Sequence, residues 1–336
     1  MKILIVRLSS LGDVIHNMPM VADILRSYPY AQIDWVVEEA YADLIELNAG
    51  IRHVIPFALR RWRKQLGQRT TWQEISAFCR HLRNENYDYV FDTQGLLKSG
   101  VVMKMARLAP QGRRIGMANG TEGCAYESIS RKFHDWSVPV PPRAHAVQRA
   151  RFVAATCLGY PLQHEAEFCM VPPGIARPAW LPAQPYVVFF HATARPSKQW
   201  PTRSWIEVGK FLAQRKLPAL HPWGNASERQ HAETLAAHIP GAIVLPSLST
   251  MEATLLANQA SLVIGVDTGL THVAAAYCRP TIELYCDSPR WNTEGNWSPN
   301  ILNLGDIGHP PTVDAVSGAI EQLLNGEHSN GKDRTC

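Results

Sequence analysis

Short apolar runs alternate with amphipathic stretches through the first half of the chain. The runs typical of strands are Lys2–Leu8, Ile33–Val37, His53–Phe57 and Tyr89–Asp92. The stretches with helical spacing are Val21–Ser27, Ala40–Leu47 and Thr71–Asn84. Alternating strands and helices place consecutive strands parallel, with helices covering the sheet. The pattern therefore predicts an α/β domain built on a parallel sheet.

A proline-rich segment, Val171–Pro185, interrupts this rhythm before it starts again. Its sequence, VPPGIARPAWLPAQP, suits neither a helix nor a central strand, because proline lacks a backbone donor and extends its neighbour. The strands expected beyond it are Tyr186–Phe190, Ala219–His221, Ala242–Leu245, Leu262–Val266, Thr281–Tyr285 and Ile301–Leu304. We therefore predict two Rossmann-like domains, residues 1–172 and 186–336, joined by a linker at 173–185.

This domain organisation also predicts where ligands bind. Open α/β sheets bind ligands at the carboxyl ends of their strands. Two doubly wound domains that face each other would leave a cleft lined by those ends. In such an arrangement the last helix of the chain is free to pack back on the first domain.

Length and charge narrow the class of protein. A chain of 336 residues suits two domains, and a formal net charge of +4 does not call for a nucleic-acid partner. Arg7 interrupts the first apolar run, which is shorter than a signal-peptide core, and no stretch approaches the roughly 20 apolar residues of a membrane span. The seven cysteines are scattered and form no C-x-x-C pair, which favours reduced thiols. We expect a cytoplasmic protein.

The first candidate site is Ser9-Ser10-Leu11-Gly12-Asp13, directly after the first strand. Because proline is tolerated only in the first turn of a helix, Pro19 predicts a helix that begins between Val14 and Met18. Asp13 would then lie between a strand end and a helix start, where its carboxylate can accept a proton from a sugar hydroxyl. The alternative is that Asp13 only caps the helix.

The second candidate follows the expected strand Leu262–Val266 and reads Asp267-Thr268-Gly269-Leu270-Thr271-His272. We expect the first three of these residues in a turn, a helix over Thr271–Tyr277, and His272 in its first turn. Backbone N–H groups at a helix start form an anion site that suits a diphosphate. The alternative is an ordinary capped turn with a surface histidine.

Two further strand ends in the second half carry charged side chains. His191–Trp200 reads HATARPSKQW, and its Lys198 is suited to neutralise a departing diphosphate. Glu228 follows Pro222-Trp223-Gly224-Asn225 and can accept hydrogen bonds from a ribose. The alternatives are a basic surface loop and an exposed helix glutamate.

A basic run in the first half, Arg60-Arg61-Trp62-Arg63-Lys64, is the fourth candidate. Its cations suit a substrate that bears carboxylates or phosphates, although charge runs are often only solvated faces. No metal-ligand spacing is recognisable, and the D-x-D triplet of many glycosyltransferases is absent. We therefore expect neither a metal nor a cofactor.

Together these segments resemble one family. They are KILIVRLSSLGDVIHNMPM, DWVVEEAYADL, VIPFALRRWRK, YDYVFDTQGLLKSG, HAVQRAR, HATARPSKQW, PWGNASERQ and VDTGLTHVAAA. In this order they resemble the lipopolysaccharide heptosyltransferases of glycosyltransferase family 9. DWVVEE and RRWRK favour the branch that adds the first heptose over its sister branch. The resemblance implies a GT-B fold, an inner-membrane peripheral enzyme, and inverting, metal-independent transfer from ADP-L-glycero-D-manno-heptose to Kdo of Kdo2-lipid A.

The resemblance also implies a role for each matching residue. Asp13 matches the catalytic base, and Lys198 matches a lysine near the donor phosphates. The implied donor contacts are Thr193, Ala194, Lys198, Glu228, Asp267, Thr268, Gly269 and His272. The implied acceptor contacts are Ser10, Gly12, Arg60, Arg61, Arg63 and Lys64.

Three departures from the family pattern leave alternatives open. Ala194 stands where a second threonine is often found, and Met117–Cys124 lacks an arginine expected near the acceptor. Tyr285-Cys286-Asp287-Ser288 replaces a Y-G-P-T-like turn. The alternative functions are transfer of the second heptose and a nucleotide-binding module without turnover.

Overall fold

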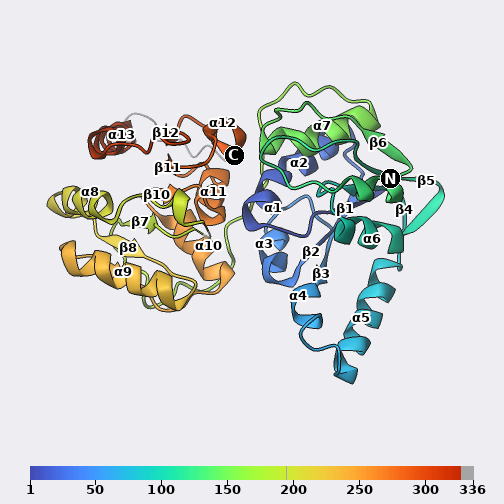
Figure 1. Ribbon diagram of the computed structural model, residues 1–336, viewed down its shortest axis with the longest axis horizontal. Helices are drawn as coiled ribbons and strands as arrows, with labels where there is room; N and C mark the ends of the chain where they lie inside the picture. The colour runs from blue at the N-terminus through green and yellow to red at the C-terminus, as the bar shows by residue number, and fades with distance from the viewer. Residues whose placement is uncertain (194, 327–336) are drawn as a thin grey trace. The chain divides into compact units, whose positions relative to one another are not determined.

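The computed structural model describes residues 1–193 and 195–326 and divides between Val171 and Pro172 into two compact units. Each unit contains one sheet whose strands all run parallel, with helices packed on it (Figure 1). The proline-rich stretch after the division contains no helix or strand among its described residues. We describe the two units separately.

The first unit, residues 1–171, is a six-stranded sheet over its described length, in the order β3-β2-β1-β4-β5-β6. Its strands are β1 (Lys2–Val6), β2 (Gln32–Glu38), β3 (His53–Phe57), β4 (Asn86–Asp92), β5 (Arg107–Met117) and β6 (Trp136–Val138). Its helices are α1 (Leu11–Asn17), α2 (Pro19–Ser27), α3 (Ala42–Glu46), α4 (Leu59–Trp62), α5 (Arg69–Leu82), α6 (Leu97–Met105) and α7 (Ala146–Leu158). This strand order is that of the Rossmann fold.

The second unit repeats the architecture with six strands in its described part, in the order β12-β11-β10-β7-β8-β9. Its strands are β7 (Val187–Phe190), β8 (Ala219–His221), β9 (Ile243–Val244), β10 (Leu262–Val266), β11 (Thr281–Tyr285) and β12 (Ile301–Gly305). Its helices are α8 (Thr202–Gln214), α9 (Ala226–His238), α10 (Thr250–Gln259), α11 (Gly269–Ala276), α12 (Arg290–Thr293) and α13 (Val313–Gly326). The two sheets have the same order when each is numbered from its own first strand, which matches the predicted pair of doubly wound domains.

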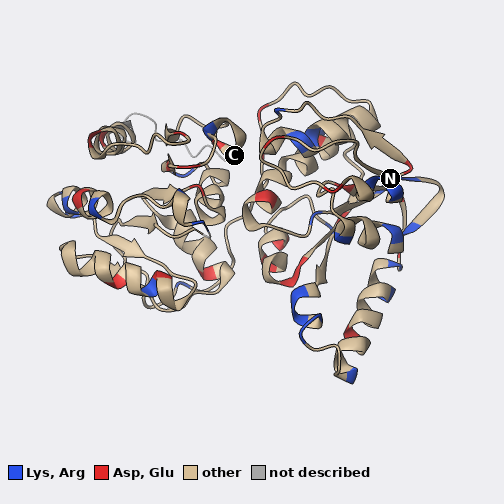
Figure 2. Cartoon of the chain, in the orientation of Figure 1, with Lys and Arg blue, Asp and Glu red and all other residues tan. Residues whose placement is uncertain are grey.

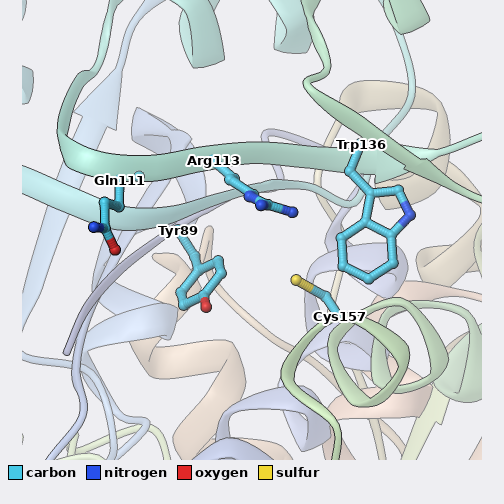
Figure 3. A pocket seen from close by; sticks show the side chains of 6 residues that line it. Tyr89, Gln111, Arg113, Trp136 and Cys157 are labelled. Atoms are coloured by element: carbon cyan, nitrogen blue, oxygen red, sulfur yellow. The ribbon is translucent and has the colours of Figure 1, made fainter.

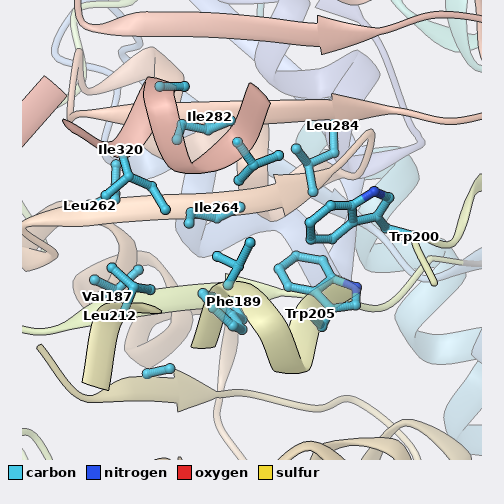
Figure 4. Close-up of a cluster of buried hydrophobic side chains, with 14 of the residues drawn as sticks. Val187, Phe189, Trp200, Trp205, Leu212, Leu262, Ile264, Ile282, Leu284 and Ile320 are labelled. Carbon is cyan, nitrogen blue, oxygen red and sulfur yellow. The ribbon is translucent and has the colours of Figure 1, made fainter. Parts of the chain in front are cut away.

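Aliphatic side chains and three aromatic ones form the core of the second unit (Figure 4). Trp205 packs between Phe189 and Trp200, with ring centroids 4.8 Å and 5.2 Å apart. Trp200 closes the Lys198 loop and is 2% exposed, so the loop ends on a fixed point. The buried residues of α13, Val316, Ala319, Ile320 and Leu323, join this core. A contact of α13 with the first domain stays a prediction.

Two helix starts differ from the sequence-based expectation. The first helix begins at Leu11, and Pro19 begins a second helix, so the predicted start between Val14 and Met18 is wrong. Pro19 constrains the helix it opens and says nothing about the one before it. In the second unit α11 begins at Gly269 and not at Thr271. Both candidate loops therefore pass into helix earlier than expected.

Two further expectations from the sequence concern the state of the cysteines and the presence of membrane-spanning helices. Free thiols occur at Cys79, Cys124, Cys157, Cys169 and Cys286. Among the described residues, no helix is both long and apolar enough to span a bilayer.

Candidate functional site

Three of the predicted site loops follow strands that flank the point where the strand order of a sheet reverses. In the first sheet this switch point lies between β1 and β4, and in the second between β7 and β10. Doubly wound sheets bind ligands at the carboxyl ends of the strands that flank such a point. Asp13 follows β1, Lys198 follows β7, and Asp267 follows β10. The loops chosen from the sequence therefore occupy the binding edge of both sheets.

Asp13 lies in the first turn of α1 and is held from two sides. Arg7 Nη2 lies 2.7 Å from Asp13 Oδ1, and the backbone N and Oγ of Ser10 donate to Asp13 Oδ2 at 3.1 and 2.8 Å. Asp13 thus reaches back to the residue that caps its own helix. Ser10 and not Asp13 is the N-cap of α1, and Asp13 completes a capping box while 37% of its side chain remains accessible.

The surroundings of Asp13 keep its carboxylate ionised. Burial raises the pKa of Asp13, but the charge of Arg7 and the hydrogen bonds from Ser10 outweigh this and hold the pKa below its ordinary value. An ionised carboxylate with an accessible face can take a proton from a hydroxyl as that hydroxyl attacks.

The loop after β4 closes the first switch point with residues that the sequence analysis did not select. Gln94 Oε1 accepts from the backbone N of Leu8 at 3.0 Å, and Lys98 Nζ donates to Ser9 Oγ at 3.0 Å. Burial lowers the pKa of Lys98. The available signal was position: the segment DTQGLLKSG follows a strand directly, as the selected loops do.

Arg149 of α7 supplies a buried cation near the segment that lacks an arginine. Its Nη2 donates to the carbonyl of Glu122 at 3.1 Å, and its Nε donates to the carbonyl of Ala144 at 3.0 Å. The charge of Arg149 contributes to the lowered pKa of Asp13. Arg149 therefore places a guanidinium beside this segment, which itself lacks an arginine.

The basic run forms α4 and the residues just after it (Figure 2). Arg61 forms two ion pairs within the chain, with Nη2 2.9 Å from Glu39 and Nη1 2.7 Å from Glu74. These contacts raise the pKa of Arg61. Trp62 is buried, and its Nε1 donates to Glu74 at 2.8 Å. Within the described ranges Arg60, Arg63 and Lys64 form no ion pair. These three positions, without Arg61, carry the charge available to an acceptor.

An ion pair spans the second switch point. Lys198 Nζ, from the loop after β7, lies 2.5 Å from Asp267 Oδ2, in the turn after β10. Asp267 Oδ1 in turn lies 3.0 Å from His272 Nε2 and accepts from Thr293 Oγ1 at 3.2 Å. Thr268 is the N-cap of α11, and Gly269 is its first residue. The structure thus brings together Lys198, Asp267, Thr268, Gly269 and His272.

His272 is buried, so the surface-histidine alternative is wrong. Its Nδ1 lies 3.0 Å from Glu283 Oε1, on the inward side of β11. Burial lowers the pKa of His272, but the carboxylates of Glu283 and Asp267 outweigh burial and raise it to about 10. Glu283 was missed by the sequence analysis. A charged residue inside the apolar strand TIELY was the signal for it.

Glu228 closes a turn at the start of α9. Its two carboxylate oxygens accept from Gly224 N and Asn225 Nδ2, each at 2.7 Å. Asn225 caps α9 through Glu228 N at 3.0 Å. Thr193 is half-buried, and Ala194 lies outside the described residues. The donor roles of Glu228, Thr193 and Ala194 remain predictions.

Three histidines beneath the Lys198 loop form a cluster that the sequence did not reveal. His191 Nδ1 lies 3.1 Å from His231 Nδ1, and the ring of His221 lies 5.9 Å from that of His191. Burial lowers the pKa of His191 to about 4 and that of His221 to about 3. The lowered pKa values keep the side chains of His191 and His221 neutral at pH 7.

One cavity of about 590 Å³ lies in the first unit, among β4, β5, β6 and α7 (Figure 3). Its lining residues are Tyr89, Gln111, Gly112, Arg113, Trp136 and Cys157. None of them is a predicted site residue. In the described part of the chain, no cluster of His, Cys, Asp or Glu is arranged to hold a metal ion.

Comparison with known proteins decides the family. The profile of "Glycosyltransferase family 9 (heptosyltransferase)" matches residues 75–319. Lipopolysaccharide heptosyltransferase 1 of Pseudomonas aeruginosa is 37% identical over 85% of this chain and 78% of its own length. The Escherichia coli K12 protein of the same name is also 37% identical, over 85% of this chain and 88% of its own. The chain belongs to glycosyltransferase family 9.

Solved structures agree with this family and with its GT-B fold. E. coli heptosyltransferase WaaC with ADP superposes with a TM-score of 0.82 and 32% identity, over 97% of this chain and 99% of WaaC. E. coli ADP-heptose lps heptosyltransferase II shares the fold, with a TM-score of 0.74 and 20% identity over 98% of this chain and all of that one. The predicted family, fold class and glycosyltransferase activity are confirmed.

Proposed function

We propose that this glycosyltransferase transfers L-glycero-D-manno-heptose from ADP-heptose to a Kdo residue of Kdo2-lipid A, in lipopolysaccharide inner-core biosynthesis. The relatives that share 37% identity are named lipopolysaccharide heptosyltransferase 1. The observation that carries the proposal is the Lys198–Asp267 ion pair at the start of α11. It puts a cation and a helix amino terminus at one switch point, where a sugar diphosphate binds best.

The donor half-site is the loop after β7 together with the turn after β10. The first backbone N–H groups of a helix have no acceptor within the helix, and those of α11 are preceded by Thr268 and Gly269. Gly269 has no Cβ, so a diphosphate can approach the backbone closely. Lys198 and the helix start would stabilise the charge that builds on the departing ADP. WaaC, which is similar to this chain, has been solved with ADP.

The acceptor half-site is the switch point of the first unit. Asp13 would take the proton of the acceptor hydroxyl as that oxygen attacks the anomeric carbon from the face opposite ADP. This single displacement inverts the anomeric configuration and needs no metal. Arg60, Arg63 and Lys64 would attract the carboxylates of the acceptor sugars, and Ser10 and Gly12 would border the hydroxyl.

The lipid nature of the proposed acceptor implies where in the cell the enzyme works. Kdo2-lipid A is anchored in a membrane, so we propose a cytoplasmic protein that binds peripherally to the inner membrane. Basic side chains near a surface with anionic lipids contribute about 1 kcal/mol each. Sedimentation with anionic and with neutral vesicles tests this, and equal binding to both would remove the electrostatic contribution.

The decisive experiment measures ADP release and product mass with ADP-heptose and one of two acceptors. We expect turnover with Kdo2-lipid A and little with the acceptor that already carries one heptose. The reverse preference would show an enzyme that adds the second heptose. Binding of ADP without turnover on either acceptor would indicate a nucleotide-binding module. A chelator control tests metal independence, and the anomeric signal of the product tests inversion.

A further inference from the structure

A ladder of alternating charges descends from the second switch point into the core. It begins at Lys198, whose side chain is 19% exposed, and passes through Asp267 and His272 to Glu283, which is fully buried. The Nζ–O and N–O distances between successive members are 2.5, 3.0 and 3.0 Å. Glu283 is the innermost charged member, and nothing in the proposed reaction so far uses it.

We infer that Glu283 is a positioning residue of the donor half-site: it holds His272 as a permanent cation, and His272 holds the Asp267 carboxylate that presents Lys198. This inference rests on the proposed function, because it concerns the site proposed for the donor diphosphate. It assigns to Glu283 a role without contact to any substrate.

The geometry around His272 requires the imidazolium form. A neutral imidazole carries one N–H and one lone pair, whereas the imidazolium donates from both nitrogens. Both nitrogens of His272 face carboxylate oxygens at 3.0 Å, in a place that water does not reach. The neutral form would turn a lone pair toward a buried anion. The raised pKa of His272 agrees with this argument.

Glu283 itself is fixed by three donors. Besides His272 Nδ1 on Oε1, Tyr285 Oη donates to Oε2 at 2.8 Å and the backbone N of Gly295 donates to Oε2 at 3.0 Å. Tyr285 begins the Tyr285–Ser288 turn that departs from the family pattern, and burial raises its pKa well above the ordinary value. Three hydrogen bonds therefore hold the Glu283 carboxylate in place in the core of the second unit.

The ladder determines how tightly Asp267 retains Lys198. The titratable groups that face His272 or Asp267 in the described residues are Glu283 and Tyr285 from β11 and Lys198 from the loop after β7. While His272 is charged, it compensates Asp267, and Lys198 can leave for an arriving diphosphate. With neutral His272, Asp267 is a buried anion balanced by Lys198 alone, and it competes with the diphosphate for that lysine.

The test is ADP affinity as a function of pH, by calorimetry, for the wild type and Glu283→Gln. Glutamine keeps the shape of the Glu283 side chain and removes its charge, so His272 should lose its proton within the pH range of the titration. We expect wild-type affinity to stay nearly constant from pH 7 to 9. The variant should lose at least about tenfold over the same interval, because a shift of one pKa unit corresponds to a factor of ten. Glu252→Gln, at the cap of α10, is the matched control and should follow the wild type.

A spectroscopic measurement tests the inference without any binding. In histidine-labelled wild-type protein, with the signal assigned through His272→Asn, the His272 imidazole should stay cationic to pH 9, and in Glu283→Gln it should titrate below that. A wild-type His272 that titrates near pH 6.5, or a variant whose ADP affinity follows the wild type throughout, overturns the inference. If the wild type does not bind ADP at all, the proposed function has failed, and the spectrum still decides the role of Glu283.

Discussion

The two switch points have the same topology, but the surroundings of the carboxylate differ between them. In the first unit, Asp13 keeps 37% of its side chain accessible and is paired with one cation, Arg7. In the second unit, Asp267 is 8% exposed in its side chain and lies between two cations, Lys198 and His272. An accessible ionised carboxylate is suited to accept a proton, whereas a neutralised one is suited to orient cations toward an anion. The same fold thus holds two chemistries, because chemistry depends on the side chains at its edge.

The largest effect is expected from Asp13→Asn, which removes the ionised carboxylate from the first switch point. Loss of a general base costs about 10² to 10⁴-fold in rate, so transfer should nearly stop. Asparagine retains an oxygen for the hydrogen bonds from Ser10, and ADP binding in the other unit should not change. Steady-state kinetics and ADP calorimetry on the folded variant measure both. Near-normal turnover would remove Asp13 from the mechanism.

Lys198→Ala tests the donor side and should come next in size. Without Lys198 the departing ADP loses a preorganised charge, which costs about 10² to 10³-fold in single-turnover rate. The matched control is Arg203→Ala, in the same unit, because Arg203 pairs with Glu207 on the exposed face of α8. If both variants lose rate equally, the effect of Lys198 is general to the domain and not local to the diphosphate.

The basic run allows a sharper test, because the structure separates its members. Replacing Arg60, Arg63 and Lys64 together by alanine should raise the apparent KM for Kdo2-lipid A by about tenfold or more, since a charge-assisted contact contributes roughly 1.5–3 kcal/mol when well formed. Arg61→Ala should instead lower the melting temperature slightly and leave that KM close to the wild-type value, because Arg61 pairs with Glu39 and Glu74. An unchanged KM in the triple variant would make the run a solvated surface.

The smallest effect on activity at pH 7 is expected from the histidine cluster, which acts on stability in acid. The folded state lowers the pKa of His191 to about 4 and of His221 to about 3, so the unfolded chain binds more protons below its ordinary value of 6.5. The stability that His191 and His221 contribute to the second unit is therefore complete above pH 6.5, and it is lost as pH falls toward 4. The slope is about 1.4 kcal/mol per pH unit for each group.

Thermal unfolding between pH 7 and 4.5 measures this slope. His221→Asn should make the melting temperature less sensitive to pH, even if it is lower at pH 7. The slope should stay unchanged in His238→Asn, because His238 is exposed on α9. An equal slope in wild type and His221→Asn would show that other groups control the acid transition.

The loops at the two switch points were largely predictable, and the reason is local. Asp13, Lys198 and Asp267 each follow an apolar run that forms a strand, and ligands bind at the carboxyl ends of the strands that flank a switch point. The helix starts were less predictable. Pro19 marks the start of α2, whereas the signal for α1 is the Ser10-x-x-Asp13 spacing of a capping box, which the sequence analysis did not use.

The residues that support these loops were not predictable in the same way. Glu283 lies within a strand and outside every segment quoted for the family resemblance, and Arg149 lies within the segment HAVQRAR, in which no residue was singled out for a role. Arg61 looked equivalent to its neighbours in the basic run until the fold brought Glu39 and Glu74 beside it.

The sequence by itself determined the succession of strands and helices, the division between two units, and the loops that carry Asp13, Lys198 and Asp267. Each of these follows from patterns within a few neighbouring residues, such as apolar periodicity, proline and the ends of strands. Only the tertiary structure decided which charges meet. Lys198 and Asp267 are 69 positions apart and share a switch point because β7 and β10 pair side by side. The burial that holds His272 charged between Asp267 and Glu283 likewise exists only once the sheet and its helices have assembled.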